Sequence, residues 1–346
     1  MKKILSSLVL AVLVLGGYLV FGKSGSSTGP QPTGDSQEKF EWIAYSTWPE
    51  SNHHTIGLKE FAQRVEEATG GRVKMTVHSG GALGYKGTEI LSVVRDNLVQ
   101  VSDMSLGNVA GEEPVFGITT LPFMLQDMQE GYTLNQLARD GYNDLLSKKW
   151  GQIILYTAPW PMAGFWTQKE IRVIEDLKGT KMRTYDRNTG LVVSALGGTP
   201  YPLPFADVYS SLATGAINSC LTSTPTAVDA KFWEVLKYYT PTSVAMTQDA
   251  VTINLNVFNK LPEDLQKIVL SVGEEMQKKM WEEVGPKLDK TMEDLCVKKG
   301  IIVTQPSEEF IAALYNQTKD IREDWLKNAP EEAKKIYADF MAKIGR

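Results

Sequence analysis

The hydrophobic and polar positions of the chain repeat with two periods that alternate along its length. Residues 40–45 and 72–78 carry an apolar side chain at about every second position, which predicts two strands. Residues 55–69, between them, carry apolar side chains every three or four positions and run into Gly70-Gly71, as expected for a helix and its end. The order strand, helix, strand predicts a β-α-β unit.

The same alternation continues toward the C-terminus. Further strands are predicted at residues 99–106, 152–158, 180–185 and 251–256. Further helices are predicted at residues 88–97, 129–150, 189–196, 207–214, 262–299 (interrupted at Gly285-Pro286) and 307–344 (divided at Pro330). Strands that alternate with helices throughout predict an α/β protein with mostly parallel sheets.

The N-terminal residues have the pattern of an export signal. Lys2 and Lys3 precede an apolar run over residues 4–21, and no A-x-A cleavage site follows. Because the run is also about as long as a membrane-spanning helix, roughly 18–20 residues, residues 1–22 are interpreted as either a cleaved signal peptide or an uncleaved signal anchor. Both place the rest of the chain in the periplasm or another extracytoplasmic space, since the positive charges stay inside. Residues 23–37, rich in Gly, Ser and Pro, predict a flexible tether.

Composition excludes several classes of function. The 346 residues include 36 Lys and Arg against 41 Asp and Glu, and this net charge of -5 argues against a protein that binds nucleic acid by neutralising phosphates. The two cysteines, Cys220 and Cys296, cannot form a disulfide framework or a four-cysteine zinc site. His53-His54, on a predicted loop, would point its side chains apart, so no metal site is expected. The sequence contains no G-x-G-x-x-G, Walker A, H-E-x-x-H or C-x-x-C motif, and no cofactor is expected.

Several short motifs follow one another in a specific order. The central one is D-L-K-G-T-K-M-R at residues 176–183, followed by G-G-T-P at 197–200 and P-F-A-D-V-Y-S-S-L-A-T-G at 204–215. Further motifs lie at residues 70–73, 80–84, 121–123, 231–235 and 261–265. As an ordered set covering about residues 40 to 270, they resemble the DctP-type substrate-binding proteins of TRAP (tripartite ATP-independent periplasmic) transporters.

The resemblance implies a periplasmic-binding-protein-like α/β fold with two lobes, discontinuous domains, an interlobe cleft and a helical C-terminal tail. Residues 38–160 and 249–288 would form lobe I, and residues 161–248 and 289–346 would form lobe II. It also implies a solute-binding protein and not an enzyme: a protein that captures a small organic acid in the cleft and delivers it to TRAP membrane subunits. We expect it to act as a monomer.

Arg183 is the first candidate for a ligand-binding residue. The resemblance implies that the arginine of the L-K-G-x-K-x-R motif holds the carboxylate of the ligand. The residues themselves agree, because Arg183 lies near the carboxyl end of a predicted strand, where ligands of open α/β sheets bind. Its planar guanidinium matches a carboxylate in bidentate geometry and stays charged.

Four more candidates follow from the motifs around Arg183. The resemblance places Phe205 over the ligand and puts Thr222 where many members carry an asparagine that contacts the carboxylate. A threonine hydroxyl can still donate a hydrogen bond there. Tyr185 and Asp186, directly after Arg183, are candidates to hold an ammonium or hydroxyl group of the ligand.

The remaining candidate residues would contact the apolar body of the ligand. Trp48, Trp160 and Trp166 are predicted in loops or strand ends that face the cleft, where they would offer flat apolar walls. Residues 160–166 contain no arginine, although many family members carry a second basic residue there, and a second buried carboxylate would lack a charged partner. We therefore predict a monocarboxylate, with an aromatic or indole-type acid ahead of an amino or hydroxy acid and a C4-dicarboxylate last.

Two other classes of function remain open from the sequence. A secreted hydrolase or lyase would need a nucleophile and base pair, which no defensible spacing of residues supplies. A ligand-sensing module of a signalling system would use the same fold, and a kinase gene beside this one would distinguish it from a transport protein.

Overall fold

The computed structural model describes residues 38–346. The predicted signal peptide or anchor and the predicted tether lie outside the described residues. Within residues 38–346, none of the helices combines the length and the hydropathy that crossing a bilayer requires.

The first sheet has five strands and is mixed. Its strands, in spatial order, are β2 (Val73–His78), β1 (Phe40–Tyr45), β3 (Val101–Ser105), β10 (Gln248–Asn254) and β4 (Gln152–Pro159). The first three run parallel, whereas β10 is antiparallel to both β3 and β4. Helices α1 (His53–Ala68) and α9 (Glu263–Lys278) pack on one face through a core that includes Leu58, Phe61 and Val269. Helices α2 (Ile90–Arg95) and α4 (Met128–Leu145) contribute to the core on the other face.

The second sheet has six short strands. In spatial order they are β11 (Ile302–Val303), β9 (Tyr238–Thr240), β5 (Gly164–Thr167), β8 (Ser219–Thr222), β6 (Lys181–Thr184) and β7 (Thr199–Pro202). Strand β5 is antiparallel to both β8 and β9. Two cores flank this sheet. One receives residues from α5 (Arg187–Ala195) and α11 (Glu308–Asn328). The other receives residues from α6 (Val208–Ala213), α7 (Thr224–Asp229) and α10 (Gly285–Lys298).

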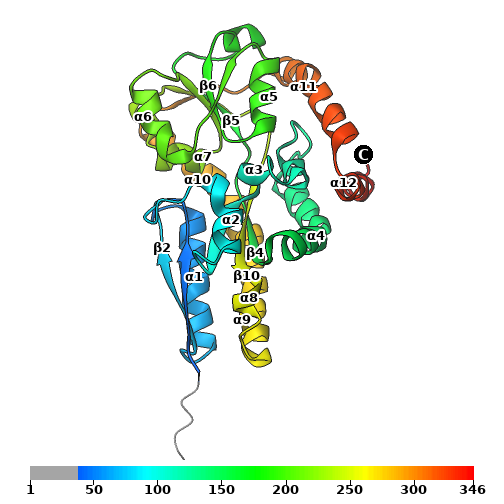
Figure 1. Cartoon of the computed structure of the whole chain (residues 1–346). Helices are drawn as coiled ribbons and strands as arrows, with labels where there is room; N and C mark the ends of the chain where they lie inside the picture. The colour runs from blue at the N-terminus through cyan, green and yellow to red at the C-terminus, as the bar shows by residue number, and fades with distance from the viewer. Residues whose placement is uncertain (1–37) are drawn as a thin grey trace, which may run out of the picture. The chain divides into compact units, whose positions relative to one another are not determined.

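The two C-terminal helices are separated at Pro330, as predicted, and they contribute to the cores of different sheets. Figure 1 shows α11 and α12 (Glu331–Ile344) at the red end of the colour range, with α11 beside α5 and α12 beside α4. Ala333, Ile336 and Phe340 of α12 accordingly lie in the core of the first sheet. The lobe boundaries expected from the sequence stay a prediction.

The predicted α/β class is confirmed, and the structure corrects four details. The sheets are mixed, because β10 and β5 each run antiparallel to both neighbours. Strands β5, β7, β8, β9 and β11 were not predicted, since two to four residues are too few to display a period. His53-His54 does not lie on a loop: it opens α1, where the Asn52 side chain accepts the backbone N–H of His54. The predicted break at Gly285-Pro286 is also wrong, because a π-helical segment, Lys279–Val284, joins α9 to α10 and Pro286 lies in the first turn of α10.

Candidate functional site

A cavity of about 680 Å³ lies between loops and strand ends that belong to both sheets. Trp48 and Trp160 line it from the first sheet, and Arg183, Tyr185 and Phe205 line it from the second. Its volume lies within the range of about 300–1,000 Å³ that small-molecule sites occupy. The sequence-predicted residues Arg183, Tyr185, Phe205, Trp48 and Trp160 therefore come together around one cavity.

Arg183 is the buried cation of this cavity. It lies on β6 with 4% of its surface exposed, and burial lowers the pKa of its guanidinium from the ordinary value without removing the charge. Its Nε donates a hydrogen bond of 3.1 Å to the Leu203 carbonyl, and its guanidinium carbon lies 5.8 Å from the Tyr185 ring centroid. Among residues 38–346 it makes no ion pair and no further side-chain hydrogen bond, so its two terminal nitrogens can serve a ligand.

Aromatic rings form a continuous wall next to Arg183. The ring centroids of Trp48 and Trp160 lie 4.8 Å apart in an edge-to-face arrangement. Phe205, from the other sheet, lies 5.5 Å from Trp48 in the same kind of arrangement. Such a wall favours a flat or ring-bearing ligand over an extended polar one.

Three predicted site residues do not line the cavity. Trp166 is fully buried in the core of the second sheet, where its ring stacks 4.0 Å from Tyr239 and its Nε1 donates to the Thr222 carbonyl at 3.1 Å. Thr222 lies beside it, buried on β8. Asp186 instead caps α5, where its Oδ1 accepts both the backbone N–H and the hydroxyl of Thr189, and burial raises its pKa. Neighbouring residues of a strand face opposite sides of the sheet. Because β5 has only four residues, the sequence showed no periodicity that would assign the Trp166 side chain to the core.

Most of the polar side chains that line the cavity were not predicted from the sequence. They are Lys86 and Thr247 in the loops before α2 and β10, Ser105 at the end of β3, Asn108 in the short helix α3 (Leu106–Val109) that follows β3, and Ser223 and Thr226 at the N-cap and in the first turn of α7. The glycine-rich motif at residues 80–84 was one available signal, because its backbone also lines the cavity. Ser223 and Thr226 could not be found, since β8 was not predicted.

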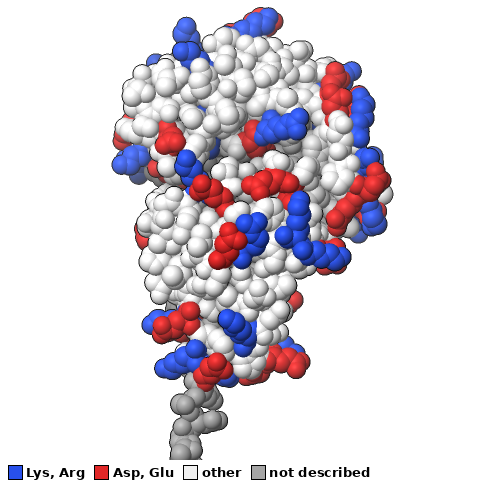
Figure 2. Space-filling view, viewed as in Figure 1, with Lys and Arg blue, Asp and Glu red and all other residues white. Residues whose placement is uncertain are grey.

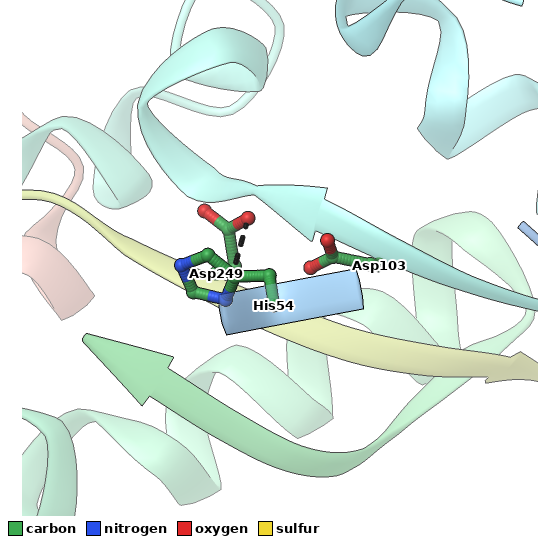
Figure 3. Close-up of side chains that lie close together, drawn as sticks. All are labelled: His54, Asp103 and Asp249. Carbon is green, nitrogen blue, oxygen red and sulfur yellow. Dashed lines mark ion pairs between the residues drawn. The ribbon is translucent and has the colours of Figure 1, made fainter. Parts of the chain in front are cut away.

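A buried polar cluster lies behind the tryptophan wall. Asp249, on β10, accepts the indole N–H of Trp160 at 2.7 Å and that of Trp48 at 2.9 Å, using one carboxylate oxygen for each. Figure 3 shows Asp249, Asp103 and the His54 ring pointing toward one another, with His54 Nδ1 3.8 Å from Asp249 Oδ2. Burial raises the pKa of Asp249 to about 6 and that of Asp103 well above its ordinary value, whereas burial and the neighbouring His53 lower that of His54.

The same three residues could hold a metal ion. Their potential ligand atoms all lie within 4.8 Å of one another, and one histidine with two carboxylates is an ordinary ligand set. Neither Asp103 nor Asp249 was singled out from the sequence, because β3 and β10 are neighbours only in the folded chain.

Charged side chains of both signs share the face of the molecule that Figure 2 shows. Figure 2 shows Lys and Arg interspersed with Asp and Glu over the face in view, without a large area of one sign. Within residues 38–346, several charged side chains are paired over one helical turn, such as Lys148 with Asp144 and Lys335 with Asp339.

Comparison with known proteins identifies relatives of the whole described fold. The 2,3-diketo-L-gulonate-binding periplasmic protein YiaO of Escherichia coli K12 is 27% identical over 298 residues, which cover 84% of this chain and 88% of YiaO. The monocarboxylate 2-oxoacid-binding periplasmic protein of Nostoc sp. PCC 7120 is 28% identical over 315 residues, covering 87% of this chain and 83% of that protein.

Solved structures agree over nearly their full length. DctP7 of Bordetella pertussis, an extracytoplasmic solute receptor binding pyroglutamic acid, superposes with a TM-score of 0.84 at 26% identity and covers 87% of this chain and 99% of DctP7. A marine metagenome TRAP solute-binding protein specific for pyroglutamate gives a TM-score of 0.83 at 26% identity, with 88% and 99% covered. The family described as bacterial extracellular solute-binding protein, family 7 (DctP), matches residues 44–328, and this chain belongs to that family.

Proposed function

We propose that this protein is an extracytoplasmic receptor that captures a small, ring-bearing monocarboxylate and delivers it to TRAP membrane subunits. One observation carries the proposal: the cavity contains a buried arginine, Arg183, whose terminal nitrogens have no partner among the described residues. A buried cation without a counter-charge is costly, and a ligand carboxylate supplies both the charge and two parallel hydrogen bonds.

The rest of the cavity supports the same class of ligand. Trp48, Trp160 and Phe205 offer flat apolar contacts, while Asn108 and Thr226 offer hydrogen bonds to a ring carbonyl or N–H. Arg183 is the only buried cation that lines the cavity in the described part of the chain, because Lys86, which also lines it, is exposed; this favours one buried carboxylate over two. The relatives support a small acid, since two are described as binding pyroglutamate and one as binding monocarboxylate 2-oxoacids.

Capture works by closing the two sheet-bearing parts around the ligand. Arg183 and Phe205 approach from one sheet and Trp48 and Trp160 from the other, so a ligand that contacts both sets stabilises the closed arrangement. The proposal includes no chemical step, and the ligand is released unchanged. A location in the periplasm and docking on membrane subunits follow from family membership. No feature of the described residues favours the hydrolase or the sensor alternative.

A ligand screen tests this proposal. The purified protein is titrated by calorimetry with pyroglutamate, a 2-oxoacid, an aromatic acid and succinate, and the bound acid is recovered and identified by mass spectrometry. We expect tight binding of at least one of the three monocarboxylates, and no binding of succinate at comparable affinity. Succinate as the tightest ligand would refute the assignment to monocarboxylates, and recovery of a chemically converted ligand would refute the receptor function.

A further inference from the structure

Two buried carboxyl groups and one buried imidazole meet behind the tryptophans that line the cavity. Asp103 lies on β3, Asp249 on β10 and His54 in the first turn of α1. In the antiparallel pairing of β3 with β10, Asp103 lies opposite Val251, two residues from Asp249, so both aspartates project from the same face of the sheet. Figure 3 shows the three side chains pointing toward one another, and their potential ligand atoms all lie within 4.8 Å of one another.

No lysine or arginine among residues 38–346 compensates the two carboxyl groups. Asp103 and Asp249 are each 1% exposed, and neither forms an ion pair with such a side chain. A buried carboxylate without a counter-charge is costly, and two carboxylates in one site repel each other as well. A divalent cation bound between these side chains would neutralise both carboxylates at once.

The hydrogen bonds leave ligand atoms available on all three side chains. Asp103 Oδ2 accepts the Ser46 hydroxyl at 3.2 Å, whereas its buried Oδ1 has no hydrogen-bond partner within residues 38–346. Each oxygen of Asp249 accepts one indole N–H, and a carboxylate oxygen has a second lone pair to offer. In the same part of the chain His54 Nε2 has no partner, and His54 Nδ1 lies 3.8 Å from Asp249 Oδ2, beyond a hydrogen bond. Because buried polar atoms without partners are rare, these atoms point to a ligand of their own.

Neighbouring side chains hold both carboxyl groups in place. Trp160 donates its indole N–H to Asp249 Oδ1 at 2.7 Å, Trp48 donates to Oδ2 at 2.9 Å, and Ser46 donates to Asp103. Carboxylates that bind metal ions are held by hydrogen bonds from such outer partners, which orient the ligand atoms. The two carboxyl groups are therefore oriented in the way that a metal site requires.

We propose that His54, Asp103 and Asp249 bind one zinc ion, and that this ion fixes the tryptophan wall from behind. The ligand set determines the class of ion. Zinc takes imidazole nitrogen and carboxylate oxygen together, and a site with three protein ligands leaves its fourth position to water. Ca²⁺ and Mg²⁺ take oxygen ligands instead, so the imidazole disfavours them.

The distances fit zinc after a small contraction. Bonds of about 2.0–2.2 Å in tetrahedral geometry place the ligand atoms of zinc about 3.4 Å apart. His54 Nδ1 and Asp249 Oδ2, which are 3.8 Å apart, need to approach by only about 0.4 Å. The widest separation among the ligand atoms is at most 4.8 Å, which rotation of the side chains can close.

The zinc site lies outside the cavity and acts on it through Asp249. None of the three ligands lines the cavity, whereas Trp48 and Trp160 do. Asp249 is the only side chain to which either indole N–H donates within residues 38–346, so an ion that fixes Asp249 fixes the orientation of both rings. Zinc binding itself goes beyond the proposed function and does not depend on it. The effect of the ion on the wall rests on the proposed function, because the wall contacts the ligand.

The first experiment measures zinc binding in the absence of any organic acid. Untagged protein is unfolded in denaturant with a chelator, refolded with or without Zn²⁺, dialysed, and analysed for metal content and thermal unfolding. We expect the parent to retain about one zinc ion per chain and to unfold at a higher temperature with zinc than without it, because an ion that binds only the folded state stabilises that state. Ca²⁺ should do neither. A parent that retains no zinc and melts at the same temperature with and without it would overturn the site.

The variant Asp103→Asn tests where the ion binds. Its amide has nearly the shape of the carboxyl group but no charge, so zinc affinity should fall by about 100-fold or more, beyond the effect of losing an outer partner. The matched control is Glu113→Gln, because buried Glu113 accepts the indole N–H of Trp150 at 2.7 Å and is not one of the three ligands. The control should bind zinc as the parent does. Equal zinc binding by Asp103→Asn and the parent would overturn the assignment to these residues.

A measurement on the parent alone covers the case in which Asp103→Asn does not fold. Co²⁺ replaces Zn²⁺ during refolding, and its visible absorption reports the coordination of the ion. We expect a stronger absorption than that of aqueous Co²⁺, as for an ion with few ligands, and displacement of the cobalt signal by added zinc. A spectrum identical to that of the aqueous ion would overturn the site.

Ligand binding tests the effect of the ion on the tryptophan wall. The parent refolded with zinc and the parent refolded without it are titrated by calorimetry with pyroglutamate, a 2-oxoacid and an aromatic acid. We expect the affinity for the bound acid to be about 5- to 150-fold higher with zinc. Equal affinities would show that the ion does not position the tryptophans. If the zinc-loaded parent binds no organic acid, the proposed function fails, whereas the zinc content of the parent and of Asp103→Asn still decides whether the metal site exists.

Discussion

Replacing Arg183 with alanine should abolish useful ligand binding and leave the fold intact. Arg183 is 96% buried in the cavity and has no ion-pair partner within residues 38–346, so the ligand carboxylate is its counter-charge. Removing one member of a buried, hydrogen-bonded charge pair costs about 2–5 kcal/mol, which corresponds to an affinity loss of roughly 30- to 5,000-fold. Arg183→Lys should also weaken binding, because an ammonium group lacks the planar fork.

The same substitution should have little effect on the ligand-free protein. It removes one hydrogen bond to the Leu203 carbonyl, worth about 1 kcal/mol, but also removes a buried cation that has no counter-charge. Calorimetric titration gives the affinity, and thermal unfolding without ligand gives the stability. Arg172→Ala is the control, since Arg172 is exposed and outside the cavity. An affinity of Arg183→Ala within threefold of the parent would refute the role of Arg183.

Three further predictions concern the aromatic wall, a contact between the N-cap of α1 and helix α7, and the close approach of helix α9 to strand β4. Phe205→Ala should weaken binding of a ring-bearing acid about 5- to 100-fold in calorimetry, whereas an unchanged affinity would exclude ring contact. Asp229 accepts Asn52 Nδ2 at 2.6 Å, and burial raises its pKa to about 6. Because of this raised pKa, the stability of the parent falls as the pH rises from about 4 to 6. In that window the free energy of unfolding of Asp229→Asn, measured relative to the parent, should increase by about 1.4 kcal/mol per pH unit. A difference between the two proteins that does not depend on pH would contradict this prediction. In Gly273→Ala the added Cβ would lie 2.4 Å from a carbonyl oxygen of β4, so thermal unfolding should show that the protein loses about 1–3 kcal/mol of stability. The control Gly111→Ala should lose almost none, because its Cβ meets nothing within 4 Å. Equal melting temperatures of the two variants would contradict the close approach.

Long periodic segments could be predicted from the sequence, and short ones could not. Strand β1 has the predicted bounds, and α1 and α4 differ from the prediction by a few residues, because each carries a full apolar stripe. The strands of the second sheet have two to four residues, and their side chains are buried on both faces in the centre of the sheet. Except for β6, which was predicted at residues 180–185, these strands show no alternation, so only their pairing in the folded chain reveals them.

The same distinction applies to the residues of the candidate site. Arg183, Tyr185 and Phe205 belong to motifs that are contiguous in the sequence, and all three line the cavity. Trp166 was expected there because it was predicted in a loop or strand end that faces the cleft, and it lies in the core because its strand alternates between two buried faces. The pair of Asp103 and Asp249 lies 146 positions apart in the sequence, and only the antiparallel pairing of β3 with β10 brings the two carboxyl groups together.

A crystal structure of the protein with its tightest-binding acid would show directly which residues hold the ligand carboxylate. We expect the ligand carboxylate to lie within about 3 Å of both terminal nitrogens of Arg183, with the body of the ligand against Trp48, Trp160 and Phe205. A carboxylate bound elsewhere in the cavity, with Arg183 paired to a protein side chain instead, would contradict it.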